Sequence, residues 1–93
     1  MRPALKKSII TETEFCVLKN LHMHYVANRE RPATEISQIA IDIGVKDKDE
    51  VLRALYILEG RSLVSPEPAG SFTSNSWKIT EIGIRAYDLA IAM

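Results

Sequence analysis

The order of structural elements predicted for residues 47–83 constrains the fold of this chain more than any other feature. First comes an amphipathic helix, whose apolar side chains recur at three- and four-residue intervals at Val51, Ala54, Leu55 and Leu58. Two short strands follow, at residues 63–65 and Ser76–Ile79, and the Pro/Gly/Ser-rich segment between them predicts a short hairpin with a loose tip. Thr80 is then placed to cap a last helix.

Two further helices are predicted before this segment. Thr11 and Glu14 have the spacing of a capping pair, and the helix that they start should end near Ala27. Its inward face carries Phe15, Leu18, Leu21 and Tyr25. Thr34 is expected to cap a second helix, which Gly44 closes in the left-handed conformation. The buried stripe of that helix consists of Ile36, Ile39, Ala40 and Ile43.

Only a tight turn at Val45 and Lys46 separates the second helix from the third. Asp47 and Glu50 repeat the spacing of a capping pair at the start of the third helix. Two helices around a short glycine-containing turn form a helix-turn-helix. Together with the hairpin, the pattern predicts a single domain over residues 1–93, mainly α with a small β-hairpin.

Composition limits what such a domain does. Apolar residues make up 46% of the chain and aromatic residues 6%, so the core must rest mainly on aliphatic side chains. Cys16, the single cysteine, is expected to be a small buried hydrophobe and not a disulfide partner. The apolar runs are too short for a signal peptide or a bilayer span, so we expect a cytoplasmic protein without membrane contact. No catalytic arrangement or phosphate-binding loop can be built from these residues, and we expect neither an enzyme nor a cofactor.

Two local runs resemble the winged helix-turn-helix superfamily of small transcription regulators. Residues 55–64 look like the exit from the third helix into the first wing strand. The superfamily often has glycine where this chain has Ser62, and Gly60 is expected to substitute by ending the helix earlier. The run Trp77-Lys78-Ile79-Thr80-Glu81-Ile82-Gly83 is similar to the aromatic-x-aliphatic-Thr-x-x-Gly run that leaves the second strand and caps the last helix. The resemblance covers roughly residues 11–89 and implies a small DNA-binding transcription regulator.

In this superfamily the third helix enters the major groove, and the wing lies along the backbone or the minor groove. The resemblance therefore places Arg53 over guanine edges or phosphate, with Asp49 and Leu52 beside it. The leading DNA contacts that it implies are Lys46, Lys48, Arg53, Tyr56, Ser74 and Asn75. Ser71 and Thr73 are further neutral donors in the wing. Tyr56 and Ile57 are not expected both to point inward, so one apolar side chain should be exposed.

The charge distribution opens an alternative to double-stranded DNA as the partner. Twelve basic residues balance twelve acidic ones, and residues 35–59 hold three basic against six acidic side chains. Residues 67–75 contain no cation, so phosphate contacts would be few. The alternative is a winged helix module for protein–protein interaction, in which the acidic third helix and Phe72 meet a partner. Arg2, Lys6 and Lys7 form either an arm that supplements groove contacts or an ordinary basic terminus.

His22 and His24 suggest a metal site together with Cys16, but their spacing argues against one. Residues two apart on a helix point to different faces, so the two imidazoles cannot jointly hold one ion. We expect no metal site, a half-buried His22 and a surface His24.

The chain ends in the apolar run Ala90-Ile91-Ala92-Met93. It fits a homodimer, in which two recognition helices read a pseudo-palindrome, or packing of this end against the first helix.

Overall fold

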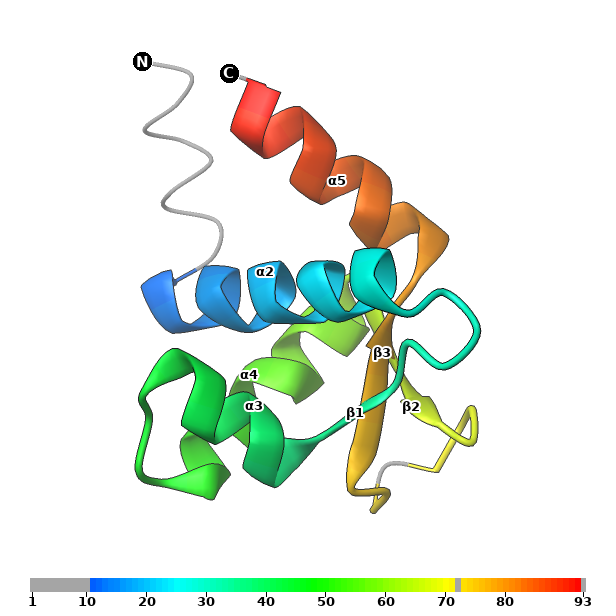
Figure 1. Ribbon diagram of the computed structural model, residues 1–93. Coiled ribbons are helices and arrows are strands. Elements are labelled where there is room, and N and C mark those ends of the chain that lie inside the picture. The colour runs from blue at the N-terminus through cyan, green and yellow to red at the C-terminus, as the bar shows by residue number, and fades with distance from the viewer. Residues whose placement is uncertain (1–10, 72, 93) are drawn as a thin grey trace.

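The computed structural model describes residues 11–71 and 73–92. Along the chain, the described elements are α2 (Glu12–Ala27), β1 (Thr34–Glu35), α3 (Ile36–Ile43), α4 (Lys48–Gly60), β2 (Val64–Glu67), β3 (Ser76–Ile79) and α5 (Glu81–Ala92). Helix α2 crosses the middle of the molecule, with α3 and α4 on one side of it and α5 on the other (Figure 1). The small antiparallel sheet lies at the end where α2 finishes. The prediction of a mainly helical chain with a small β-hairpin is confirmed.

Helix α2 starts and ends where the sequence predicts. The Thr11 hydroxyl accepts from the Glu14 N–H over 3.2 Å, and Glu14 Oε1 accepts from the Thr11 N–H over 3.1 Å. This reciprocal pair satisfies two backbone donors that the first turn leaves without a helical partner. The helix then runs to Ala27.

The core lies between α2, α3, α4 and the inner face of the sheet. Its largest fully buried side chains are Trp77, Leu21, Ile39, Leu55, Leu58, Val17, Val51, Val64 and Pro66. The residues predicted to be buried on the third helix are therefore buried, while Phe15, Tyr25 and Ile43 lie partly exposed at the edge of the core. Each fully buried aliphatic side chain contributes roughly 1.5–3 kcal/mol of transfer free energy. The position of α4 is fixed by these inward residues, and its opposite face remains available.

Thr34 does not cap α3, which corrects the prediction. It lies in β1 opposite Trp77, while Glu35 takes the N-cap position without a side-chain hydrogen bond. The Ile36 N–H instead donates to the Asn75 carbonyl over 2.8 Å. A two-residue strand carries no readable periodicity, so this long-range pairing left no local signal. Gly44 ends α3 with a φ of 78°, as predicted.

The sheet has the order β1-β3-β2, and both pairings are antiparallel. The hairpin is confirmed, but its first strand is Val64–Glu67 and so lies slightly later than predicted. Pro66 sits opposite Trp77 within this strand. An edge strand tolerates proline because only one of its sides belongs to the ladder. The sheet therefore buries Trp77 on its central strand and leaves the hairpin projecting from the helices (Figure 1).

The exit from α4 is closed by Ser62 and not by Gly60. Ser62 adopts a positive φ of 66°, and Gly60 remains the last helical residue. The N–H groups of Ser62 and Leu63 donate to the carbonyls of Glu59 and Leu58, over 2.8 and 3.0 Å. This is the paired bonding of a Schellman motif, which requires a left-handed residue at the position of Ser62. The helix therefore ends at Gly60, as predicted, but the left-handed residue that closes it is Ser62.

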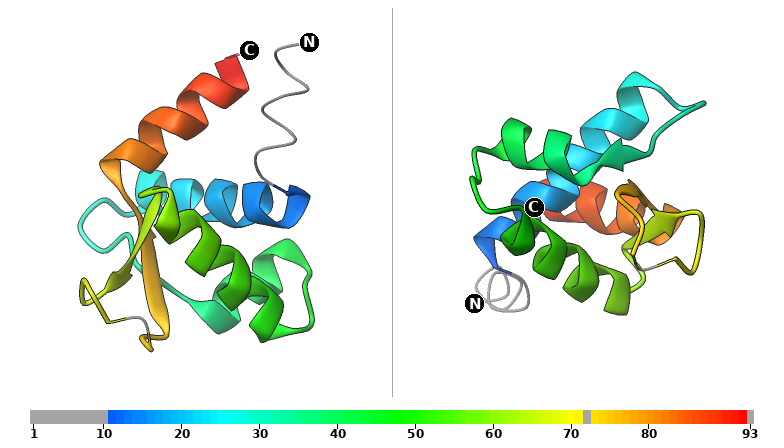
Figure 2. Two further views of the ribbon diagram at one scale, coloured as in Figure 1. Left: turned by 180° about the vertical axis from the view of Figure 1, so that it is seen from behind. Right: turned by 90° about the horizontal axis from the view of Figure 1, so that it is seen from below.

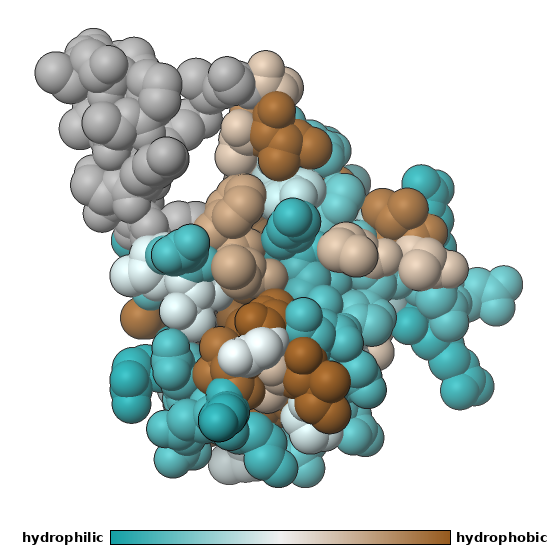
Figure 3. Space-filling view, turned by 60° about the vertical axis from the view of Figure 1, so that its left-hand side comes forward, coloured by the Kyte–Doolittle hydropathy of each residue, from teal (hydrophilic) through white to brown (hydrophobic). Residues whose placement is uncertain are grey.

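Helix α5 is held at its start and is exposed along much of its length. Thr80 caps it, because its hydroxyl accepts from the Gly83 N–H over 3.0 Å. Tyr87 packs its ring against Phe15 of α2, with 5.6 Å between centroids. Ile82, Leu89 and Ile91 are 57, 63 and 58% exposed. The helix diverges from α2 towards its end (Figures 1 and 2), where apolar side chains reach the surface (Figure 3). Of the terminal apolar run, Ala90 is half-buried, whereas Ile91 and Ala92 are exposed and do not pack closely against the first helix; Met93 lies outside the described residues.

Candidate nucleic-acid interface

The outer face of α4 is open to solvent. A four-residue turn, 44–47, connects α3 to α4, and Lys46 is exposed within it. Lys48, Asp49 and Arg53 are exposed on the helix itself. From behind, α4 lies at the front of the molecule and no other element crosses it (Figure 2, left). The structure thus places the three predicted cationic contacts along one accessible surface, with Lys46 in the turn before α4 and Lys48 and Arg53 on the helix.

The three carboxylates at the start of α4 have different surroundings. The Asp47 side chain accepts from the Asp49 N–H over 2.9 Å and caps the helix, as predicted. Glu50 was expected to complete a capping pair, but its Oε2 accepts from the Thr13 hydroxyl of α2 over 3.3 Å. Within residues 11–71 and 73–92, the Asp49 carboxylate has neither a hydrogen bond nor an ion pair. The helix start therefore holds one capping acid, one acid turned towards α2 and one acid that faces solvent.

Tyr56 and Ile57 both reach the surface. Tyr56 is 43% exposed and Ile57 is 40% exposed. The prediction that at least one apolar side chain is exposed here is therefore confirmed. The Tyr56 ring meets the Trp77 ring edge-on, with 6.0 Å between centroids. Tyr56 therefore connects the outer side of α4 to the central strand of the sheet.

Some polar side chains of the hairpin are bonded within the hairpin itself, including Ser74, which the sequence predicts as a DNA contact. The Ser74 hydroxyl donates to the Glu67 carbonyl over 2.6 Å and accepts from the Ser76 N–H over 3.1 Å. Lys78 lies 3.7 Å from the Glu67 carboxylate, so this cation of β3 is paired across the hairpin. Thr73 and Asn75 are exposed. Asn75 is therefore the more available of the two hairpin contacts that the sequence singled out, while Phe72 lies outside the described residues.

A hollow of about 290 Å³ brings α3, α4 and the hairpin together. It is lined by Glu35, Ile36, Ser37, Lys48, Asp49, Leu52 and Asn75. Lys48 and Asn75, which are predicted from separate parts of the sequence, both line this hollow. Glu35 and Ser37 were not predicted, because their place beside the hairpin depends on the pairing of β1 with β3. Arg53 lies outside the hollow, further along the exposed face of α4.

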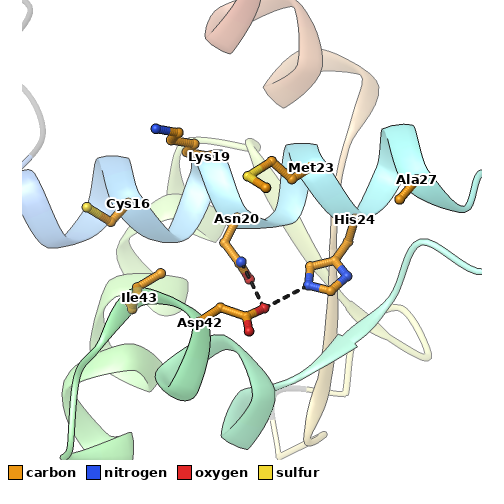
Figure 4. Close-up of a pocket in the computed structure, with 8 residues that line it drawn as sticks. All are labelled: Cys16, Lys19, Asn20, Met23, His24, Ala27, Asp42 and Ile43. Atoms are coloured by element: carbon orange, nitrogen blue, oxygen red, sulfur yellow. Dashed lines mark hydrogen bonds and ion pairs between the residues drawn. The ribbon is translucent and has the colours of Figure 1, made fainter.

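A second hollow lies between α2 and α3 and has Asp42 on its floor (Figure 4). Asp42 accepts from Asn20 Nδ2 over 3.1 Å and from Gln38 Nε2 over 2.8 Å, and its Oδ2 lies 3.1 Å from His24 Nε2. The hydrogen bond from Asn20, followed by those from His24 and Gln38, lowers the pKa of Asp42 below its ordinary value of 3.8. Cys16 lines the same hollow and is only half-buried, so the expectation of a buried cysteine is wrong.

The two histidines of α2 point to different helices, as predicted. His22 Nε2 lies 3.2 Å from Asp88 of α5, whereas His24 contacts Asp42 of α3. His22 is the less exposed of the two side chains. Among the described residues, no three His, Cys, Asp or Glu side chains are grouped so that they could hold a metal ion. The histidines instead connect α2 to its neighbours on both sides.

No helix within residues 11–71 and 73–92 is long and apolar enough to cross a membrane. The basic residues Arg2, Lys6 and Lys7 lie outside the described part of the chain. Comparison with protein-family models, curated proteins and solved structures found no match to this sequence or fold.

Proposed function

We propose that the protein is a small DNA-binding transcription regulator, in which α3 and α4 act as a helix-turn-helix and the β2–β3 hairpin acts as a wing. One observation carries this proposal: the outer face of α4 is uncovered and exposes Lys48 and Arg53, and Lys48 lines a hollow together with Asn75 of the hairpin. An α-helix fits the major groove of B-DNA, which is about 12 Å wide. An exposed second helix of such a pair is the element that enters this groove.

The contacts divide by position along the interface. Arg53, in the middle of α4, donates to guanine edges or to phosphate, while Lys46 and Lys48 at the helix start neutralise phosphates. Asn75 contributes from the hairpin, and Tyr56 from the side of α4 nearest to β3. Ser74 is the weakest of these contacts because its hydroxyl proton is already donated to the Glu67 carbonyl.

The proposed DNA-binding form is a homodimer. Two copies related by a two-fold axis place two recognition helices about one helical turn of DNA apart. Ile82 and Leu89, seven residues apart on α5, share one side of that helix and are 57 and 63% exposed. These side chains supply a surface that a second copy of the chain would cover.

Binding to mixed-sequence duplex DNA at low and at physiological salt tests the proposal. Fluorescence anisotropy of wild-type protein is expected to report binding at low salt, and Arg53→Ala should weaken it about ten-fold. Arg31→Ala is the matched control, because Arg31 is also an exposed arginine but lies in the segment between α2 and β1. Absence of binding at low salt, or equal losses for both variants, would contradict the proposal.

A second function is favoured by the exposed Tyr56 and Ile57 on α4. In this alternative the protein is a winged helix module for protein–protein interaction, and the apolar side chains and nearby carboxylates of α4 meet a protein partner. Two results together would support this alternative. The protein would retain no DNA at low salt, and it would form a specific complex with another protein that Ile57→Ser disrupts.

A further inference from the structure

We infer that Asp49 reads cytosine in the major groove, while Arg53, one helical turn later, reads guanine. This inference rests on the proposed function and deepens it by stating which bases the α4 face selects. It also gives a role to the acidic residue that argues most directly against DNA binding at the start of α4.

The three carboxylates at the start of α4 differ in whether another group already binds them. Asp47 is occupied by capping, and Glu50 is occupied by the Thr13 hydroxyl. Asp49 is exposed and has no hydrogen-bond or ion-pair partner among residues 11–71 and 73–92. Helix capping therefore accounts for Asp47, and the contact with α2 accounts for Glu50. The Asp49 carboxylate remains available.

Asp49 and Arg53 are placed to act together. Residues four apart on a helix share one face, and their Cα atoms are about 6 Å apart along the axis. The structure records no ion pair between the two side chains, although this spacing allows one. Successive base pairs are about 3.4 Å apart along the DNA axis. The two side chains can therefore reach base pairs one or two steps apart.

The chemistry of the major groove selects cytosine for a carboxylate. Phosphates repel Asp49, so only base amino groups offer it a donor. The N6 amino group of adenine stands beside N7, an acceptor that faces a carboxylate unfavourably, whereas the N4 amino group of cytosine has no acceptor beside it on its own base. Arg53 matches the O6 and N7 acceptors of guanine. The outer face of α4 therefore selects a cytosine and a guanine within two base-pair steps.

Selection of bound sequences from a random duplex library tests this inference. Sites bound by wild-type protein are expected to contain the cytosine, with about ten-fold preference over other bases at that position. Asp49→Asn should change the preferred base to adenine, because an amide supplies both the donor for N7 and the acceptor for N6. Glu50→Gln is the matched control: it removes the same charge from the next residue, whose side chain is turned towards Thr13, and it should leave the base preference unchanged.

The outcomes separate this inference from the proposed function. DNA binding that depends on Arg53 but shows no preference for cytosine would overturn the inference and leave the proposed function standing. The same selected base for wild type and Asp49→Asn, or an equal change caused by Glu50→Gln, would also overturn it. If wild-type protein retains no duplex at low salt, both the proposed function and the inference fail.

Discussion

The Thr80 hydroxyl donates a hydrogen bond to the Ser62 carbonyl over 2.6 Å. The Thr80 N–H also donates to the Leu63 carbonyl over 3.0 Å, and the same hydroxyl accepts from the Gly83 N–H. These bonds join the end of α4 to the start of α5, two segments that lie 18 residues apart in the sequence. They fix the hairpin between the two helices, and with it the position of the hairpin beside α4.

Gly83→Ala is expected to destabilise the fold by roughly 3 kcal/mol. A Cβ at this position would overlap the Leu63 carbonyl oxygen and would lie 2.7 Å from Cγ1 of Ile79. Urea unfolding measures the change in free energy. Gly60→Ala is the control, because a Cβ there meets no atom within 4 Å, and the variant should be neutral or slightly stabilised. Similar losses in the two variants would contradict the close approach at Gly83.

Ser62→Gly is expected to stabilise the protein by about 0.5–1 kcal/mol. The serine has a φ of 66°, which is costly for a residue with a Cβ, and glycine removes most of that cost. Part of the gain is lost to the greater freedom of glycine in the unfolded chain. Ser65→Gly in β2 serves as the control, because a glycine within a strand should destabilise it. Thermal unfolding compares the variants, and a lower Tm for Ser62→Gly would count against the left-handed exit of α4.

Because of Asp42, the free energy of unfolding should fall as the pH is lowered through the acidic range. The pKa of Asp42 is lower in the folded protein than its ordinary value of 3.8, so its contribution is fully present above 3.8 and is lost as the pH falls through the lowered pKa. Asp42→Asn should therefore be less stable than wild type at neutral pH, and the difference should shrink below about pH 4. Glu30→Gln is the control, because Glu30 lies outside the helices and its exposed carboxylate has no hydrogen-bond or ion-pair partner among the described residues. A difference between wild type and Asp42→Asn that is constant from neutral pH to pH 3 would exclude this linkage.

The dependence of DNA affinity on salt should be shallow. Lys46, Lys48 and Arg53 are the cations of the proposed interface, and about 0.9 counterions are released for each phosphate that a protein neutralises. A plot of log affinity against log salt concentration is therefore expected to have a slope no steeper than about −3 for each protomer. Lys48→Ala should reduce the slope by about one. A much steeper slope would show that cations elsewhere in the chain, outside this set, contact the DNA.

Leu89→Glu should convert the proposed dimer into a monomer without loss of stability. Leu89 is 63% exposed within one chain, so a charge there costs little unless a second copy covers it. Sedimentation velocity gives the mass, and thermal unfolding checks the fold. Ile41→Glu is the control, because Ile41 is 73% exposed on α3 and should leave the mass unchanged. A monomeric wild type, or a Leu89→Glu variant that remains dimeric, would contradict an interface through this side of α5.

Local patterns predicted the elements whose signals lie within a few residues. The capping pair of Thr11 and Glu14 fixed the start of α2, and the apolar spacing of α4 identified its buried face. Gly44 marked the end of α3, because few other residues adopt its backbone conformation without cost. The exposure of Lys48 and Arg53 follows from the same periodicity, since the side of α4 opposite its apolar stripe has to face away from the core.

Contacts between distant segments escaped these patterns. Thr34 looks like a cap in sequence but pairs with Trp77 in β1, and Glu50 looks like a capping partner but contacts Thr13. The same uncertainty affects the end of α4, where Gly60 and Ser62 both fit a helix exit. The roles of Thr34 and Glu50 cannot be chosen from neighbouring residues alone, because their partners lie in other elements.

The amino-acid sequence by itself determined the helices, the hairpin and the apolar face of each helix, since these depend on side-chain periodicity and on caps within one or two turns. The tertiary structure decided which polar groups remain available. It uses Glu50 to reach α2 and Ser74 to close the hairpin, and it leaves Asp49 and Arg53 exposed on α4. The physical reason is that a hydrogen bond needs its two partners within about 3 Å, and only the folded chain brings residues from separate elements that close.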